Sequence, residues 1–282
     1  EANPGGAPCN VLAMLAKLGR QTAFIGKVGQ DRFGRLLREV IESVGIDAGG
    51  LISDKEVHTT LAFVHTYPDG DRDFSFYRSP GADMMLRKEE VACDKIRESR
   101  IFHFGSLSFT HPGVREASIH AIRCAKEAGA WISFDPNLRE PLWNDLADAK
   151  KAIEYGMGCC DILKISDYDK GALFLQDKYK IPLLCVTLGK EGSRAYYKGM
   201  KVTGKPFLQE NTIETTGAGD TFTGCMLNTV LEKGLSCLTK EDIRQMLLFA
   251  NGGASLITTR RGALKVMPGK KEIEDLLGYT KE

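Results

Sequence analysis

The sequence lacks several features that would define a class directly. Its 282 residues include 38 Lys plus Arg and 37 Asp plus Glu, so the formal net charge is +1 and no broad basic field is present. No run reaches the ~18 apolar residues that a membrane-spanning helix needs. The five His residues show no zinc-ligand spacing, and none of the eight Cys residues forms a C-x-x-C pair. We therefore expect no nucleic-acid partner and no membrane partner.

The cysteines stand mostly in apolar runs such as residues 183–186. Free cysteine is among the most buried residue types, and thiols persist in reducing compartments. The sequence therefore predicts reduced, buried thiols and a cytoplasmic location.

Strand-like and helix-like segments alternate along most of the chain. Expected strands are 22–28, 100–104, 130–134, 161–165 and 182–187, and expected helices are 11–18, 33–44, 111–128, 145–155, 217–233 and 240–257. Such alternation is typical of an α/β fold with a doubly wound, mostly parallel sheet and helices on both faces. No linker or repeat interrupts it, so we expect a single domain over residues 1–282.

One region departs from this alternation. Residues 58–67 and 72–78 are two β-rich runs joined by Pro68-Asp69-Gly70-Asp71, which is a hairpin pattern. The sequence predicts a small β lid, inserted within the domain over residues 57–80.

The strongest candidate site is the glycine-rich segment 215–224. Gly217 and Gly219 permit a tight turn that leaves backbone N–H groups free at the start of a helix, where anions bind. Asp220 follows in the first turn, where a carboxylate accepts a proton from a hydroxyl that attacks phosphorus. The alternative is a simple glycine turn in which Asp220 only complements the helix dipole.

A second glycine cluster lies at Gly5-Gly6, with Asn10 near the start of the next helix. Its amide is placed to bind hydroxyl groups, and the alternative is a loop with an ordinary cap. Several standard motifs are missing, among them the G-x-x-x-x-G-K-[ST] phosphate loop and the G-x-G-x-x-G dinucleotide fingerprint. The missing fingerprint disfavours a nicotinamide-dependent oxidoreductase.

Together the two clusters resemble the two signatures of the PfkB (ribokinase-like) carbohydrate kinases, and most specifically the fructokinase branch. The resemblance extends over essentially the whole chain. Further matching segments are 29–34, 76–84, 135–143, 164–167, 186–192 and 250–263. The resemblance implies a ribokinase-like fold with ATP and Mg²⁺ as cofactors.

The resemblance also implies site residues. Asp220 corresponds to the catalytic base, and the amides of Gly217, Ala218 and Gly219 to the site for the transferred phosphate. The implied sugar-side residues are Gly5, Gly6, Asn10, Arg78, Asn137 and Arg139. The implied nucleotide-side residues are Thr187, Gly189, Lys190, Gly192, Asn251 and Gly253. For Arg139, a structural salt bridge is the alternative to phosphate binding.

Three departures from the family pattern bear on ions and on the sugar. Asp169 stands where the family has Glu, and it is expected to hold Mg²⁺ through water. Glu214 stands where Asp is usual, so the potassium site that the family often forms here, with Thr216, is an open expectation. The family also begins with a strand that carries a sugar-binding Asp. We expect this strand to precede residue 1, and the alternative is a protein that lacks the strand, part of the lid and this sugar ligand.

The combined prediction is an ATP-dependent fructokinase that makes fructose 6-phosphate. The alternatives are a kinase for 2-keto-3-deoxygluconate, ribose or another small polyol, and a kinase-like protein without catalysis. The intact Asp220 and Gly217-Ala218-Gly219 disfavour the non-catalytic alternative. The expected partners are a sugar and ATP, with a homodimer formed through the lid.

Overall fold

The central element is a six-stranded, mostly parallel sheet. A computed structural model describes residues 3–66 and 72–278, and the expected turn at 68–71 lies outside these residues. The strands are β5 (Ile101–Gly105), β6 (Trp131–Asp135), β7 (Ile162–Ser166), β8 (Leu183–Thr187), β9 (Ser193–Tyr197) and β10 (Met200–Gly204). They are adjacent in the order β10-β9-β8-β7-β6-β5, with β5 to β8 parallel and β9 and β10 antiparallel.

Both faces of this sheet are buried, which explains the continuous apolar strands. Along β8, Leu183 and Cys185 face one core, while Leu184 and Val186 face the other. Successive side chains of a strand point to opposite faces, so a strand covered on both sides must be apolar at nearly every position.

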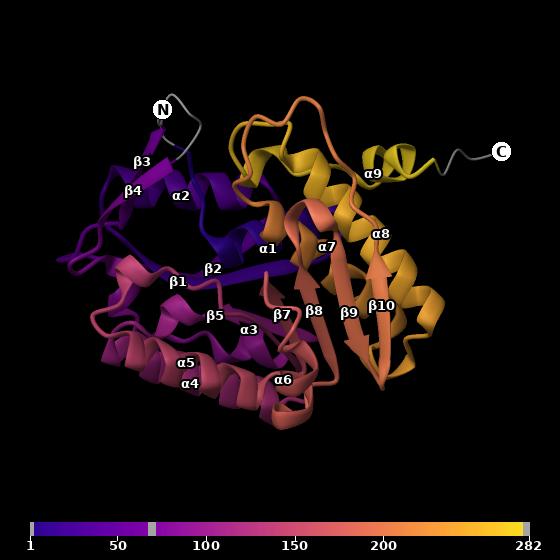
Figure 1. Ribbon diagram of the computed structural model, residues 1–282. Helices are drawn as coiled ribbons and strands as arrows, with labels where there is room; N and C mark the ends of the chain where they lie inside the picture. The colour runs from indigo at the N-terminus through magenta and orange to yellow at the C-terminus, as the bar shows by residue number, and fades with distance from the viewer. Residues whose placement is uncertain (1–2, 67–71, 279–282) are drawn as a thin grey trace.

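Helices cover the two faces in separate layers (Figure 1). One layer contains α1 (Ala7–Lys17), α2 (Arg32–Ser43), α7 (Ala218–Lys233), α8 (Lys240–Ile257) and α9 (Lys270–Leu276). The other contains α3 (Cys93–Arg97), α4 (Pro112–Glu127), α5 (Leu146–Cys159) and α6 (Ala172–Tyr179). The predicted α/β class with helices on both faces is confirmed. No described helix is both long and apolar enough to cross a membrane.

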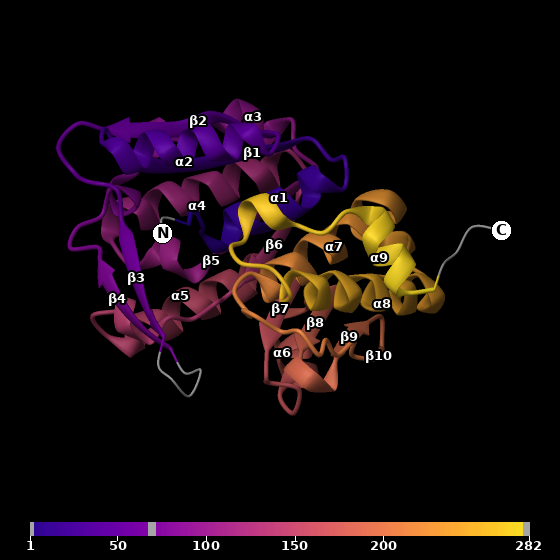
Figure 2. The ribbon, with the colours of Figure 1, turned by 90° about the horizontal axis from the view of Figure 1, so that it is seen from above.

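A separate parallel ladder joins β1 (Thr22–Gly29) to β2 (Ile46–Asp54). Among the described residues this ladder is not hydrogen-bonded to the six-stranded sheet. Figure 2 shows α1 between the β1–β2 unit and the α7–α8 pair. The sequence did not predict β2, because Gly49-Gly50 interrupts its apolar pattern. The expected strand before residue 1 stays a prediction.

The predicted lid hairpin forms as β3 (Leu61–Thr66) and β4 (Arg72–Tyr77), which pair antiparallel. It projects from the β2 side of the molecule (Figure 1). On its described surface, Phe63 and Tyr77 are exposed and their rings meet edge to face at 5.2 Å.

The cysteines do not all follow the expectation of free thiols. Cys93, at the start of α3, forms a disulfide with Cys124 of α4. The other six are free, and of these only Cys9, Cys160, Cys185 and Cys225 are buried. The expectation was wrong for Cys93 and Cys124 because they are 31 positions apart in sequence and are brought together only when α3 packs on α4.

Candidate active site

The start of α7 forms the centre of the site. Gly217 caps the helix with φ of 80°, in the left-handed region that glycine adopts readily. The first N–H groups of a helix have no partner within it, so those of Gly219 and Asp220 are available to an anion. The N–H of Ala218 instead donates to the Thr215 carbonyl at 3.3 Å. The anion site predicted from the amides of Gly217, Ala218 and Gly219 stays a prediction.

Gly219 also has a steric reason to be glycine. A Cβ atom at this position would lie 3.0 Å from Lys164 Nζ. The lysine side chain therefore occupies the space beside the helix start.

Asp220 lies in the first turn of α7 and is hydrogen-bonded to α1. Asn10 Nδ2 donates to Asp220 Oδ2 at 2.7 Å. Burial raises the pKa of Asp220 to about 6, although the Asn10 hydrogen bond and the charges of Lys164 and Arg139 oppose the shift. A carboxyl group with a pKa near neutrality is suited to accept a proton during a reaction.

Asn10 also contributes an unused acceptor. The residue is 4% exposed, and its Oδ1 is buried without a hydrogen-bond partner. A buried acceptor without a partner costs free energy unless a donor reaches it. A hydroxyl group bound beside Asp220 would supply that donor.

A buried ion pair lies near Asp220. Lys164 of β7 approaches Asp135 at the end of β6, with Nζ 3.2 Å from Oδ2, and the two side chains are 6% and 9% exposed. Lys164 also donates to Ser166 Oγ at 3.0 Å. The sequence placed Lys164 only in a matching segment. The detectable signal was a lysine inside the apolar strand 162–166, where an unpaired charge would be costly.

His103 of β5 also belongs to the buried polar cluster around Asp135 and Lys164. The sequence did not predict this position for His103. Its Nδ1 lies 2.9 Å from Ser133 Oγ on the neighbouring β6. Burial lowers the pKa of His103 to about 4, although the nearby Asp135 opposes the shift. His103 is therefore neutral at physiological pH and adds no charge beside the ion pair.

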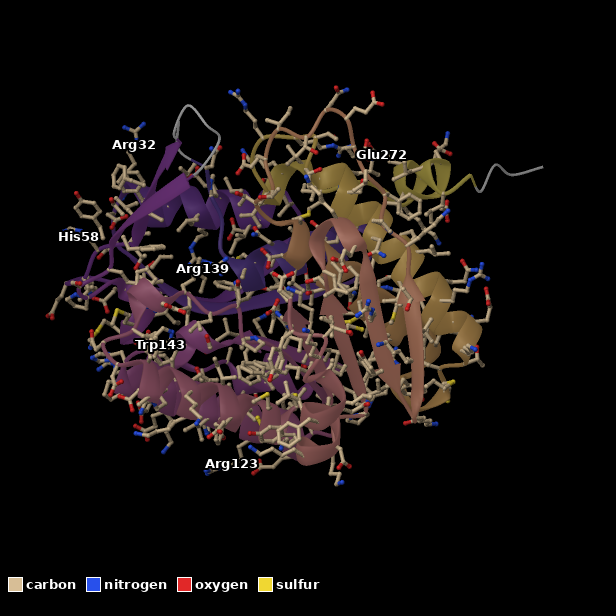
Figure 3. All side chains as sticks on the ribbon, viewed as in Figure 1. Arg32, His58, Arg123, Arg139, Trp143 and Glu272 are labelled. Carbon is tan, nitrogen blue, oxygen red and sulfur yellow. A yellow bond between two sulfur atoms is a disulfide. The ribbon has the colours of Figure 1, made fainter. Side chains whose placement is uncertain are left out.

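Arg139 lies in the loop after β6, where ligands bind in open α/β sheets. Its only hydrogen bond among the described residues is to the Leu138 carbonyl, and it forms no salt bridge there. Figure 3 shows the Arg139 side chain on the side of the loop that faces away from α4 and α5. The structural alternative for Arg139 is therefore disfavoured. Asn137 precedes it with φ of 40°, a turn in which its N–H donates to Asp135 Oδ1.

Arg78, expected on the sugar side, is bound at the base of the lid. Its Nε donates to Asp83 Oδ2 at 2.8 Å, and a terminal nitrogen donates to the Leu107 carbonyl at 3.2 Å. Thr60, just before β3, donates to the other oxygen of Asp83. Arg78 therefore joins the two ends of the lid to the segment after β5, and a sugar contact by Arg78 stays a prediction.

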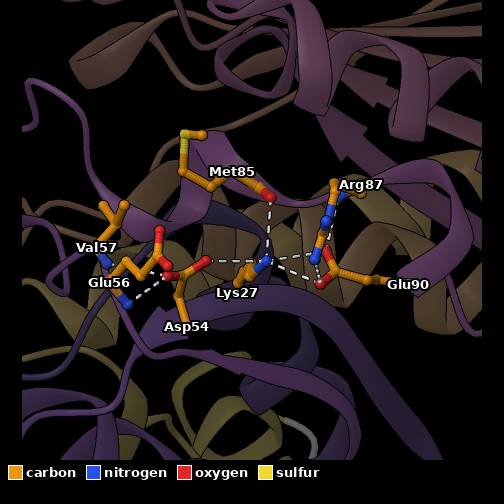
Figure 4. A network of polar contacts seen from close by, with 7 residues as sticks. All are labelled: Lys27, Asp54, Glu56, Val57, Met85, Arg87 and Glu90. Carbon is orange, nitrogen blue, oxygen red and sulfur yellow. Dashed lines mark hydrogen bonds and ion pairs between the residues drawn. The ribbon is translucent and has the colours of Figure 1, made fainter.

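A second network holds the lid base through Lys27 of β1 (Figure 4). Lys27 is 3% exposed in its side chain, and its Nζ lies 3.0 Å from Asp54 Oδ2 and 2.9 Å from Glu90 Oε1. It also donates to the Met85 carbonyl at 3.2 Å. Asp54 accepts hydrogen bonds from the N–H groups of Glu56 and Val57, which lower its pKa to about 2. One buried ammonium thus links the segments before and after the lid.

Gly5 and Gly6 precede α1 at the exposed surface. Gly6 has φ of 140°, and an added Cβ on either glycine would meet no described atom within 4 Å. Open space therefore adjoins both residues, on the helix that carries Asn10.

The expected nucleotide residues 187–192 lie at the end of β8. Thr187 Oγ1 is 3.1 Å from Ser166 Oγ, so the ends of β7 and β8 are linked. Gly189 and Gly192 have φ of 53° and 87°. A Cβ on Gly192 would collide with the Gly204 carbonyl, and Lys190 between the two glycines is exposed. The geometry gives structural reasons for both glycines.

Packing accounts for Asn251 and Gly253 on α8. Asn251 is 7% exposed and donates to the Lys205 carbonyl at 2.9 Å. A Cβ on Gly253 would lie 2.9 Å from Cys225 Sγ of α7, so α8 and α7 can approach closely only with glycine at that position. A place beside the adenine stays a prediction for both residues.

Asp169 has partners that argue against the expected magnesium role. Its carboxylate pairs with Arg194, accepts from Tyr196 Oη at 2.5 Å and lies 3.6 Å from Lys201 Nζ. Two cations already neutralise this carboxylate. The network ties the segment after β7 to β9 and β10, which the sequence did not predict as strands.

Glu214 and Thr216 precede the anion site in a loop held against the end of α8. The backbone N–H of Glu214 donates to the Thr258 carbonyl at 3.1 Å, and the N–H of Gly262 approaches Glu214 Oε2 at 3.5 Å. The loop is therefore fixed, and a monovalent cation at this place stays a prediction.

The fold and the geometry define a class of protein: an α/β protein in which a buried carboxyl group lies in the first turn of a helix whose start is open to an anion. Residues 1–269 match the pfkB family of carbohydrate kinases. A probable fructokinase-2 of Arabidopsis thaliana is 40% identical over 94% of this chain and 84% of that protein.

Two solved structures of fructokinases are also similar to this chain. A fructokinase from Xylella fastidiosa with bound ATP has a TM-score of 0.87 and 30% identity, covering 99% of this chain and 91% of that one. A fructokinase from Vibrio cholerae in a form with fructose, ADP and calcium has a TM-score of 0.86 and 28% identity, covering 98% and 92%. The chain belongs to the pfkB family of carbohydrate kinases.

The Asp220→Asn variant is expected to lose ~10²–10⁴ in kcat, because the amide keeps the shape but cannot accept a proton.

In the wild type, activity should rise through about pH 6 as Asp220 loses its proton. Folding raises the pKa of Asp220, so between about pH 4 and 6 the folded state binds more protons than the unfolded state. The contribution of Asp220 to the free energy of unfolding therefore falls as pH rises through that window.

Urea unfolding across pH, run beside the activity profile, checks both parts. Relative to Asp220→Asn, the wild type should lose stability from pH 4 to 6, because the lowered pKa of His103 acts in the opposite direction but equally in both proteins. A variant that keeps more than about a tenth of the wild-type kcat would remove Asp220 from this role.

The Lys27→Met variant is expected to lose about 3 kcal/mol of unfolding free energy, because Asp54 loses its cation and Glu90 keeps only the exposed Arg87. Lys95→Met is the matched control. Its ion pair with Asp47 is exposed, so the expected loss is below about 1 kcal/mol. Urea unfolding of both variants compares them. Equal losses would show that the lid base does not depend on Lys27.

Proposed function

We propose that this chain is an ATP-dependent fructokinase, which transfers the terminal phosphoryl group of ATP to D-fructose and yields fructose 6-phosphate. The observation that carries the proposal is the carboxyl group of Asp220, held by Asn10 at the anion-binding start of α7 with a pKa of about 6. Fructose is favoured because the Arabidopsis relative and the two bacterial structures are named as fructokinases.

In this proposal Asp220 accepts the proton of the attacking sugar hydroxyl. Asn10 Nδ2 holds one oxygen of the carboxylate and so directs the other toward the hydroxyl. The amides at the start of α7 stabilise the charge on the transferred phosphoryl group, and the helix dipole adds to the effect. Lys164 and Arg139 stabilise the ionised form of Asp220.

Mg²⁺ is the metal that we propose to accompany ATP, and it supplies charge neutralisation on the phosphate oxygens. The acidic side chains near the helix start are Asp220 and Asp135, and Asp135 is already paired with Lys164. Mg²⁺ usually keeps several waters and is held in part by substrate phosphates, so it needs few ligands from the protein. Asp169 has no part in the proposal.

The remaining proposals concern a second ion, assembly and location. Glu214 and Thr216 are proposed to border a K⁺ site, supported by a loop that the Thr258 carbonyl holds in place. A homodimer through the lid is supported by the exposed aromatic pair Phe63 and Tyr77. A single domain and a cytoplasmic location stay predictions.

An ADP-release assay with a panel of sugars tests the proposed substrate. We expect kcat/KM for D-fructose to exceed that for ribose and for 2-keto-3-deoxygluconate by at least about tenfold, because unmatched hydroxyl contacts leave polar groups such as Asn10 Oδ1 unpaired. A preference for either other sugar would overturn the substrate assignment while leaving the kinase activity in place. Release of ADP with none of the sugars would overturn the function.

The Arg139→Ala variant tests the cation beside the site. We expect kcat/KM to fall about 10–100-fold, since hydrogen bonds to charged groups contribute ~1.5–3 kcal/mol. Arg139 lowers the pKa of Asp220, so its loss should move the acidic limb of the activity profile to higher pH. Arg123→Ala, on α4 and far from Arg139 in Figure 3, is the control and should change neither quantity. An unshifted limb in Arg139→Ala would contradict the placement.

A further inference from the structure

A group of metal-ligand side chains lies between α3 and α4, in the helix layer that does not carry Asp220 (Figure 1). It consists of Cys93 at the start of α3 and of His120 and Cys124 one turn apart on α4. One ligand atom from each lies within 4.8 Å of the other two. In the structure the two sulfur atoms are joined as a disulfide.

A disulfide alone does not explain the position of His120. Its Nε2 lies 3.3 Å from Cys93 Sγ and 3.8 Å from Cys124 Sγ, so the imidazole nitrogen is directed at both sulfur atoms. Tetrahedral zinc bonds of about 2.3 Å to sulfur and 2.0 Å to nitrogen require an S···N separation of about 3.5 Å. The two observed separations lie on either side of that value. Only the sulfur atoms would have to move apart.

We propose that the reduced protein binds one Zn²⁺ through Cys93, His120 and Cys124. Thiolate and imidazole ligands favour Zn²⁺ over Mg²⁺ and Ca²⁺, which prefer oxygen. Within the described part of the chain no other His, Cys, Asp or Glu joins the group, so water takes the fourth position. Cys93 and His120 are partly exposed, which gives the metal access.

Reduction comes before binding and is balanced by a dithiol reductant. The reductant transfers two electrons and two protons to the Cys93–Cys124 bond, which becomes two thiols, and is itself oxidised to a disulfide. Zn²⁺ then displaces the two thiol protons, because thiolate is the ligand form. In both redox states the same pair of residues therefore joins α3 to α4.

Metal analysis of the full chain tests the site. The protein is reduced with a phosphine, which does not compete as a thiol ligand, and is then equilibrated with Zn²⁺, with Co²⁺ as an absorbing substitute, or with Mg²⁺. We expect one Zn²⁺ per reduced chain, thiolate-to-Co²⁺ absorption, and a Tm that Zn²⁺ raises and Mg²⁺ does not. The oxidised protein should show none of these changes.

Variants make the test specific to these side chains. Cys93→Ser and His120→Gln should each weaken Zn²⁺ binding by more than about 100-fold, because loss even of a supporting partner costs 10–100-fold. Cys159→Ser, a half-buried free cysteine of α5 outside the group, is the matched control and should bind like the wild type.

Three outcomes would overturn the proposal. The first is absence of Zn²⁺ from the reduced wild type, and the second is binding by Cys93→Ser and His120→Gln equal to that of Cys159→Ser. The third is a disulfide that the phosphine leaves intact in the folded protein, shown by a thiol count, since the thiolates would then never be available.

Discussion

The carboxyl group of Asp220 is held where water is scarce, and the surrounding site is arranged around that constraint. Burial raises the pKa of this carboxyl group and so disfavours the ionised form that can accept a proton. The Asn10 hydrogen bond and the charges of Lys164 and Arg139 partly restore the ionised form, which leaves the pKa at about 6. The side chains come from α1, the strand ends and α7, so the pKa of one group depends on the packing of the whole sheet.

The same buried site accounts for Gly219 and for the ion pair between Lys164 and Asp135. Gly219 leaves room for Lys164, and Lys164 is tolerated in an apolar strand because Asp135 and Ser166 satisfy it. Removal of either charge would leave the other buried and unpaired, which is more costly than the pair itself is stabilising. Function and stability are therefore tied together at the ends of β6 and β7.

The lid follows a different principle. Two polar networks hold the segments at its base. Lys27 links the segments that flank the lid, and Asp83 links Thr60 to Arg78. Hydrogen bonds and ion pairs have defined directions, so these networks fix where the lid begins and ends.

The sequence by itself determined the α/β class, the long helices α7 and α8 and the lid hairpin. It also indicated Asp220 as the candidate base. These rest on periodicity, glycine turns and local motifs, which are properties of neighbouring residues. It could not determine that Asn10 bonds Asp220 across 210 positions, that Lys164 lies against Gly219, that Asp169 is neutralised by Arg194, or that Cys93 meets Cys124. Those pairings are long-range contacts, and only the tertiary structure decides them, because packing rather than sequence spacing sets which distant side chains meet.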